Sequence, residues 1–176
     1  MASMRRVAVI GSPGAGKSTL ARRLGEILGL PVYHLDRLYW NPGWREMPRD
    51  RFEAMHAALL ERPRWIIDGH YGNTLEARLD AADTVVYLDF PRGICLRRAF
   101  LRTLRRESRP DISAGCPESV SGLPSFLWYI WKFRDKNEGA IEAMLEEVSD
   151  SVRIHRLSSP EECGAFLRDL EVGRSV

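Results

Sequence analysis

The stretch Gly-Ser-Pro-Gly-Ala-Gly-Lys-Ser-Thr, residues 11–19, decides the fold of this chain. It follows an apolar run, Val7–Ile10, and it precedes a segment, Leu20–Leu24, in which apolar and basic residues alternate. A strand, a glycine-rich loop and a helix in this order are the context that the pattern G-x-x-x-x-G-K-[ST] requires. The sequence therefore predicts a phosphate-binding loop rather than a chance glycine-rich turn.

The residue types of this loop suit a magnesium-bound nucleotide. Glycine tolerates positive φ, so the backbone can approach an anion closely, and amides at the first turn of a helix point at that anion. The Lys17 ammonium can reach the β- and γ-phosphates, and the Ser18 hydroxyl is placed to bind the Mg²⁺ that bridges them. We expect nucleotide contacts from the whole loop: Gly11, Ser12, Pro13, Gly14, Ala15, Gly16, Lys17, Ser18 and Thr19.

Length and composition favour one domain in a reducing compartment. The 176 residues suffice for a single core, and the net charge of +2 argues neither for nor against a nucleic-acid partner. The three cysteines show no C-x-x-C spacing, which argues against a disulfide framework and a zinc site. No signal peptide is evident, and the run Phe126–Trp131 is too short to span a bilayer. We expect a cytoplasmic protein with no membrane partner.

Three apolar segments that read as strands end at an aspartate: Asp36, Asp68 and Asp89. In an open α/β sheet, ligands bind beyond the carboxyl ends of the strands. Asp36 is therefore a candidate to hold or deprotonate an acceptor hydroxyl, and an ordinary helix N-cap is the alternative.

Asp68 and Asp89 compete for the metal-binding role beside Ser18. Asp68 is preferred, because Gly69 lets a ligand approach closely whereas Phe90-Pro91 crowds Asp89. The residue after Asp68 is glycine and not the glutamate with which many motor-type ATPases activate water, so hydrolysis is the less favoured reaction.

The segment Ile94–Arg109 predicts a helix with an arginine face. Arg98, Arg102 and Arg105 fall opposite the apolar side chains of this segment at 100° per residue. A solvated basic face is one interpretation. Because the segment belongs to a chain with a phosphate-binding loop, we prefer the interpretation that these arginines contact the transferred phosphoryl group.

Residues 108–124 are rich in turn formers and lack periodicity, which predicts a functional loop, and we expect a lid over about residues 106–136. The aromatic side chains of 126–133 then suit lid packing or self-association. We expect helices over 50–60 and 138–148, a last strand over 152–157 and a terminal helix to Leu170. Residues 37–48 read as an irregular segment whose aromatics either clamp an acceptor or pack as a small cluster.

Together the motifs resemble the adenylate-kinase-like branch of the P-loop kinases, and within it the bacterial DNA topology modulation proteins, or FlaR group. The matching pieces span nearly the whole chain: GSPGAGKST, HLDRLYW with NPGW, WIIDGHY, AADTVVYLD, RRAFLRTLRR and RPDISAGCPES. The resemblance implies a P-loop NTPase fold, an α/β three-layer α/β/α sandwich with a five-stranded parallel sheet in the order 2-3-1-4-5. It also implies ATP, or a related triphosphate, and phosphoryl transfer to a nucleotide or another small-molecule acceptor.

By motif position, Asp36 and Arg37 resemble acceptor-site residues of related kinases, and Asp68 resembles the metal-associated aspartate. Arg98 and Arg102 resemble the paired arginines at the base of the lid. Adenylate kinases usually follow the aspartate of the third strand with Gly-Phe/Tyr-Pro-Arg, whereas here His70-Tyr71 follows Gly69, so the motif that goes with AMP as the acceptor is incomplete in this chain. We count Tyr71 among the acceptor-binding residues.

The sequence thus predicts a single kinase-like domain over residues 1–176, with an acceptor-side segment over about 36–62. The expected catalytic residues are Lys17, Asp36, Arg98 and Arg102, and the expected magnesium ligands are Ser18 and Asp68. A nucleotide-dependent hydrolase or switch and a DNA-associated protein are the alternatives, and the charge distribution gives DNA little support. Monomer and homodimer both stay open.

Overall fold

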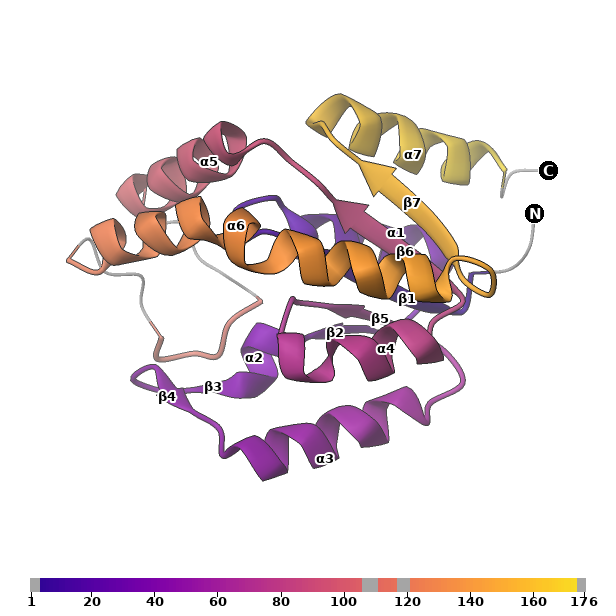
Figure 1. Ribbon diagram of the computed structural model, residues 1–176, viewed down its shortest axis with the longest axis horizontal. Coiled ribbons are helices and arrows are strands. Elements are labelled where there is room, and N and C mark those ends of the chain that lie inside the picture. The colour runs from indigo at the N-terminus through magenta and orange to yellow at the C-terminus, as the bar shows by residue number, and fades with distance from the viewer. Residues whose placement is uncertain (1–3, 106–110, 117–120, 174–176) are drawn as a thin grey trace.

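The computed structural model describes residues 4–105, 111–116 and 121–173 (Figure 1). Its main sheet consists of parallel strands: β1 (Arg6–Gly11), β2 (Val32–His34), β5 (Trp65–Asp68), β6 (Thr84–Leu88) and β7 (Arg153–Leu157). A small antiparallel hairpin is formed by β3 (Trp40–Asn41) and β4 (Arg45–Glu46). The helices are α1 (Lys17–Leu28), α2 (Leu35–Tyr39), α3 (Arg49–Leu60), α4 (Leu75–Ala81), α5 (Arg92–Arg105), α6 (Leu123–Val148) and α7 (Pro160–Val172), with a 3₁₀ turn, η1 (Gly72–Thr74).

The sheet has the order β2-β5-β1-β6-β7, which confirms the predicted order 2-3-1-4-5 when only the strands of this sheet are numbered along the chain. Residues 7–10 of β1 are fully buried, as expected for a central strand with helices on both faces. The register pairs Asp68 with Val9 on one side and with His34 on the other. The loop after β1 and the ends of β2 and β5 therefore share one edge of the sheet.

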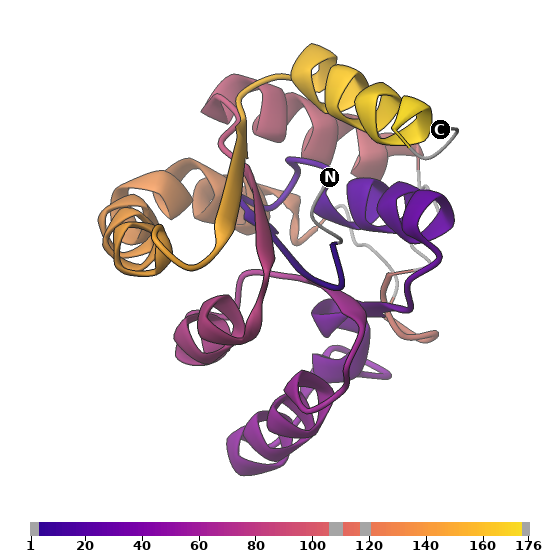
Figure 2. The same cartoon turned by 90° about the vertical axis from the view of Figure 1, so that its right-hand side faces the viewer.

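Helices cover both faces of the sheet and produce the predicted three layers (Figure 2). Alternate residues of β1 point to opposite faces, so Ala8 and Ile10 join one core cluster while Val7 and Val9 join the other. The first cluster contains side chains of α3, α4 and α6, and the second contains side chains of α1, α5 and α7. The α/β fold class is thus confirmed.

Two local predictions are wrong. The region 126–148 is one continuous helix, α6, and not two helices, because residues 134–137 carry no helix breaker and Arg134 bonds Glu138 one turn later. Residues 37–48 are not irregular throughout: α2 runs to Tyr39, and the hairpin follows, with its turn at Pro42–Trp44. Gly43 takes a φ of 78° there, which suits a tight turn.

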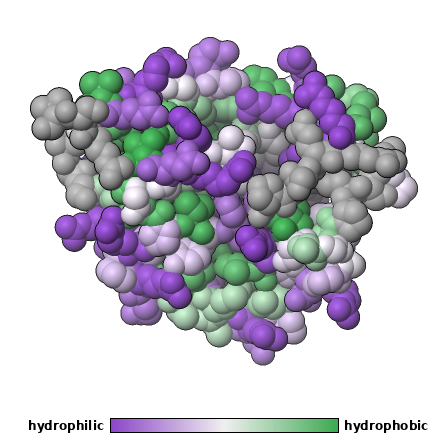
Figure 3. Space-filling model, turned by 180° about the vertical axis from the view of Figure 1, so that it is seen from behind, coloured by the Kyte–Doolittle hydropathy of each residue, from purple (hydrophilic) through white to green (hydrophobic). Residues whose placement is uncertain are grey.

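The lid boundaries stay a prediction, since residues 106–110 and 117–120 lie outside the described part of the chain. The surface seen from behind in Figure 3 has hydrophilic residues spread among hydrophobic ones. Within the described ranges, no helix combines the length and the apolar character needed to cross a membrane.

The buried His56 on α3 makes stability depend on pH. This side chain is 2% exposed, and burial together with the charge of Arg78 lowers the pKa of His56 to about 4. The unfolded chain binds a proton at His56 below about pH 6.5, whereas the folded state resists protonation until about pH 4. The free energy of unfolding should therefore fall as the pH is lowered across this range.

The substitution His56→Leu removes this proton uptake while it keeps an apolar side chain in the core. We expect the loss of unfolding free energy between about pH 6.5 and pH 4 to shrink by about 1–3 kcal/mol relative to the unmodified protein. Urea unfolding at half-unit pH steps measures the difference. If the free energy of unfolding changed with pH equally in the two proteins, His56 would not be the source of the pH dependence.

Candidate active site

The loop between β1 and α1 has the backbone of a phosphate-binding loop. Gly14 and Gly16 have φ values of 82° and 100°, which side-chain-bearing residues rarely adopt. A Cβ atom at Gly14 would lie 2.5 Å from the carbonyl oxygen of Cys95 on α5. The Lys17 Nζ donates to the Ser12 carbonyl at 3.0 Å, so the ammonium lies across the loop.

Gly11 serves the fold more directly than the ligand site. It has a φ of 137°, and a Cβ at this position would lie 2.5 Å from the carbonyl oxygen of Leu88 on β6. A cavity beside this loop is lined by Pro13–Thr19 but not by Gly11 or Ser12. The glycine at the start of the motif therefore lets β1 and β6 approach closely.

Ser18, Asp68 and His34 form a chain of hydrogen bonds at the edge of the sheet. The Ser18 hydroxyl donates to Asp68 Oδ2 at 2.7 Å, and His34 Nδ1 donates to Asp68 Oδ1 at 2.5 Å. Burial alone would lower the pKa of His34, but the hydrogen bond and charge of Asp68, together with the charge of Asp111, outweigh burial and raise it. His34 thus fixes the orientation of a carboxylate that is only 3% exposed.

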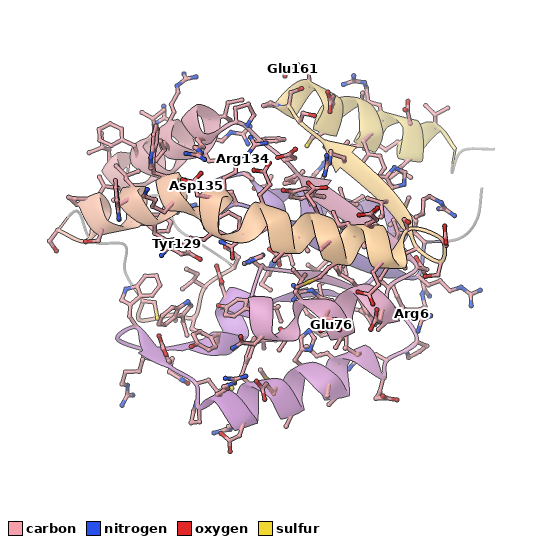
Figure 4. All side chains as sticks on the ribbon, in the orientation of Figure 1. Arg6, Glu76, Tyr129, Arg134, Asp135 and Glu161 are labelled. Carbon is pink, nitrogen blue, oxygen red and sulfur yellow. The ribbon has the colours of Figure 1, made fainter. Side chains whose placement is uncertain are left out.

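Asp89, the other candidate for the metal-binding role, does not line the cavity. It lies 3.7 Å from Arg134 on α6, in an ion pair. Figure 4 shows Arg134 and Tyr129 leaving opposite sides of α6, and Tyr129 is the one that lines the cavity. The geometry therefore brings Asp68, and not Asp89, to the phosphate-binding loop.

Asp36 and Tyr71 meet in the lining of the same cavity. The Tyr71 hydroxyl donates to Asp36 Oδ1 at 2.8 Å, and burial together with the negative charge of Asp36 raises the pKa of Tyr71. Tyr71 has a φ of 38°, an unusual value for a residue with a side chain, and its ring packs against Tyr39 and Phe52. The tyrosine is therefore held in place by packing as well as by the carboxylate.

Arg37, in contrast, is not brought to the cavity. Its side chain is exposed and is not among the lining residues, whereas the neighbouring Asp36 is. Consecutive residues of a helix point about 100° apart, so α2 can direct only one of the two inward. The Arg37 carbonyl instead accepts a hydrogen bond from the Ser113 hydroxyl at 2.7 Å.

The arginine face of α5 lines the cavity as the sequence predicts. Arg98 donates through Nη1 to the Ala15 carbonyl of the phosphate-binding loop at 2.8 Å. Arg102 and Arg105 line the same cavity. The apolar side chains Phe100 and Leu104 are 42% and 52% exposed, so this helix turns its arginines inward.

Several site residues were not identified from the sequence. Arg78 on α4 is fully buried and donates through Nη2 to the carbonyls of Gly69 and His70 at 2.8 and 2.7 Å. Burial lowers the pKa of Arg78 to about 10. His70 is hydrogen-bonded to Asn137 of α6 at 3.0 Å. These contacts fix the loop between Asp68 and Tyr71. The one sequence signal for them is that Arg78 stands among the apolar residues of α4.

One cavity of about 1190 Å³ joins these groups. Its wall includes the phosphate-binding loop, the arginines of α5 and aromatic side chains of the hairpin and α6. Its polar and aromatic lining residues include Lys17, Ser18, Thr19, Arg22, Asp36, Trp40, Trp44, Asp68, His70, Tyr71, Phe90, Arg98, Arg102, Thr103, Arg105, Asp111, Phe126, Tyr129 and Asn137. The space can therefore hold two ligands side by side, one on the loop and one near Asp36.

The oxygen donors fit magnesium. Mg²⁺ prefers hard oxygen ligands and usually shares its coordination sphere with phosphates and water. Ser18 and Asp68 supply such oxygens beside the loop. In the described residues, no group of three or more His, Cys, Asp or Glu side chains could hold a metal ion.

Known proteins with similar sequences are shikimate kinases. Shikimate kinase 1 of Enterobacter sp. (strain 638) is 30% identical over 133 residues, which cover 66% of this chain and 74% of that protein. Shikimate kinase 1 of Escherichia coli (strain K12 / DH10B) matches with the same identity and coverage. No protein-family model matches the chain.

Solved structures show the same fold at lower identity. A shikimate kinase from Acinetobacter baumannii in complex with shikimate superposes with a TM-score of 0.57 at 19% identity, covering 98% of this chain and 94% of that chain. A gluconokinase from Sinorhizobium meliloti 1021 gives 0.55 at 17% identity, covering 98% and 93%. The predicted adenylate-kinase-like P-loop kinase is thereby confirmed. The chain belongs to the shikimate kinase-like family of P-loop kinases and is a phosphotransferase.

Proposed function

We propose that this kinase transfers the γ-phosphoryl group of ATP to a hydroxyl group of a small molecule that binds between Asp36 and the arginines of α5. The observation that carries the proposal is the shared cavity, in which Asp36 and Tyr71 face the same space as the phosphate-binding loop. Mg²⁺ is the expected partner of the nucleotide, with Ser18 and Asp68 as its protein contacts. When bound, the metal neutralises phosphate charge.

The side chains have distinct roles in this proposal. Lys17 and Arg98 already donate to carbonyls of the phosphate-binding loop, so their charges are held at the place where a triphosphate would bind. Arg102 adds positive charge to the lining of the same cavity. Catalysis of phosphoryl transfer rests mainly on such positioning and charge stabilisation.

Asp36 is the proposed group that orients the acceptor hydroxyl and accepts its proton. A carboxylate has about four lone-pair positions, so it can accept from Tyr71 and from a substrate hydroxyl together. The bond from Tyr71 fixes the rotamer of Asp36, which helps to set the direction of attack. Trp40, Trp44 and Tyr129 supply flat apolar walls beside it.

The names of the similar proteins suggest which acceptors to test first. The similar proteins are named for shikimate and gluconate, so these two acids come first in a screen, followed by nucleosides and nucleoside monophosphates. A thermal-shift screen with a non-hydrolysable ATP analogue identifies binders, because a ligand that binds only the folded state raises the melting temperature. ADP formation that depends strictly on the added acceptor would favour a kinase over a hydrolase.

Other features stay predictions from the sequence. They are the narrower resemblance to the topology modulation proteins, any association with DNA, the cytoplasmic location, the choice of ATP over GTP, and the state as monomer or homodimer. The domain bounds and Arg37 as an acceptor contact also stay predictions.

The substitution Lys17→Ala tests the nucleotide half of the site. We expect acceptor-dependent ADP formation to fall by at least about 100-fold, because a charge at the transferring phosphates is lost. Circular dichroism should show an unchanged fold. Lys132→Ala is the matched control, since Lys132 packs over Trp128 and does not line the cavity. Full turnover in the Lys17 variant would refute the kinase assignment.

The substitution Asp36→Asn tests the acceptor half. We expect kcat to fall by about 10²–10⁴-fold while calorimetry finds the affinity for the ATP analogue unchanged, because only the proton acceptor is removed. Tyr71→Phe should cause a smaller loss, since it removes one hydrogen bond to that carboxylate. If the Asp36→Asn enzyme kept its kcat, Asp36 would have no catalytic role and would only be an acidic residue in the first turn of α2.

A further inference from the structure

Two aromatic residues that line the cavity have a strained backbone. Among the residues that the structure describes, Trp44 and Tyr71 are the non-glycine residues with positive φ, at 57° and 38°. Both line the cavity, although one lies in the hairpin turn and the other follows β5. A bulky side chain rarely adopts such angles, and strain of this kind is retained mostly at ligand sites.

The turn itself does not require a tryptophan. The hairpin pairs Asn41 with Arg45, so residues 42–44 form a three-residue loop. Loops of this length usually place glycine at their left-handed position, because glycine adopts it without strain. Trp44 stands there instead and is 38% exposed. Since glycine would satisfy the turn, the role of the indole ring is to be found in the cavity that it lines.

A row of aromatic rings leads from the hairpin turn to Asp36. The ring centroids are 5.5 Å apart between Trp44 and Trp40, and 5.0 Å apart between Trp40 and Tyr39. The next distance, between Tyr39 and Tyr71, is also 5.0 Å, and the Tyr71 hydroxyl donates to Asp36. Trp40, Trp44 and Tyr71 line the cavity, and Tyr39 supports them without lining it.

Tyr129 of α6 adds a further ring near Asp36. It lines the cavity and is 48% exposed, and Phe133 contacts its ring edge-on at a centroid distance of 6.1 Å. Partial burial raises the pKa of Tyr129, and the negative charge of Asp36 raises it further, so the phenol and the carboxylate lie near one another. Figure 4 shows Tyr129 on the side of α6 that faces α2 and the hairpin. We call Trp40, Trp44, Tyr71 and Tyr129 the aromatic wall.

The polar side chains next to the aromatic wall are neutral or negative. His70 precedes Tyr71 and contacts the ring of Phe133, and its bond to Asn137 holds the imidazole in place. Burial and nearby positive charges lower the pKa of His70 to about 4, so it is uncharged at neutral pH. Together with the carboxylate of Asp36, these groups suit an uncharged flat ring with hydroxyl groups better than they suit a carboxylic acid.

We propose that the acceptor is a nucleoside whose base stacks on the aromatic wall while a sugar hydroxyl meets Asp36. A nucleoside combines a flat ring with a hydroxylated sugar, and aromatic side chains stack on any base because every base has a π-face. This inference rests on the proposed function, in which Asp36 accepts the hydroxyl proton. The hydroxyl oxygen forms a bond to the γ-phosphorus, and the bond from that phosphorus to the bridging oxygen breaks, so ADP leaves with the electron pair.

Calorimetry on the protein saturated with Mg²⁺ and a non-hydrolysable ATP analogue tests the substrate class. The probes are adenosine, guanosine, cytidine and uridine, with shikimate and gluconate as acids that lack an aromatic ring. Methyl riboside is the matched ligand control, since it keeps the sugar hydroxyls and lacks the base. We expect at least one nucleoside to bind about tenfold or more tightly than methyl riboside and than either acid.

The substitution Trp44→Gly tests the stacking. For the nucleoside that binds most tightly, we expect the Kd and the KM to rise by about tenfold while kcat stays within about twofold, because stacking stabilises the bound substrate and the transition state alike. The melting temperature of the unliganded protein should stay within about 2 °C, since relief of the left-handed strain offsets the lost contacts.

Two further variants complete this experiment. Tyr129→Leu removes a flat ring from α6 and keeps an apolar side chain, so it should raise the Kd of the same nucleoside by about threefold or more. Trp128→Ala is the matched control, because Trp128 is 62% exposed on the same helix and does not line the cavity. It should bind the nucleoside and the ATP analogue as the unmodified protein does.

The outcomes separate this inference from the proposed function. If no nucleoside binds more tightly than methyl riboside, or if Trp44→Gly and Tyr129→Leu both keep full nucleoside affinity, no base stacks on the aromatic wall and the kinase proposal stands. A tenfold weaker affinity of Trp44→Gly for the ATP analogue would assign the aromatic wall to the nucleotide instead, and a fall of more than about 5 °C in both melting temperatures would assign it to packing. If the unmodified protein does not bind the analogue, both proposals fail.

Discussion

The parallel register of β2, β5 and β1 is the constraint on which the rest of the site depends. It pairs Asp68 with His34 on one side and with Val9 on the other, so the ends of three strands lie in a row. The phosphate-binding loop follows β1, and Asp36 follows β2 in the first turn of α2. A slip of one residue would turn Asp68 to the opposite face of the sheet and separate it from Ser18.

The charged groups at this edge are held by hydrogen bonds to backbone carbonyls. Lys17 and Arg98 donate to carbonyls of the phosphate-binding loop, and Arg78 donates to the carbonyls that follow Asp68. Fixed donors of this kind need little reorganisation when a negatively charged ligand arrives, which is the source of much of the catalytic power in phosphoryl transfer. The fully buried guanidinium of Arg78 positions the loop that carries Tyr71, with no exposure to the cavity itself.

The two sides of the cavity differ in how they are built. The nucleotide side consists of a loop between central elements of the fold, and solved kinases with the same fold superpose over nearly the whole chain at under 20% identity. The side of the cavity that carries Asp36, where we propose that the acceptor binds, consists of the short helix α2, the hairpin and the segment 111–116, which meet through a few hydrogen bonds. A shared scaffold with variable loops explains how related kinases act on different acceptors.

The sequence alone determined the phosphate-binding loop and the arginine face of α5, because these depend on local patterns. The strand order came from the resemblance to the adenylate-kinase-like P-loop kinases, and the sheet confirms it. The sequence also ranked Asp68 above Asp89, but only the register and the ion pair of Asp89 with Arg134 decided where each carboxylate points. The contacts of Ser18 with Asp111, 93 positions away, and of Asp68 with His34 were decided by tertiary structure. No local pattern encodes them, because such pairs form only when packing brings distant segments to one place.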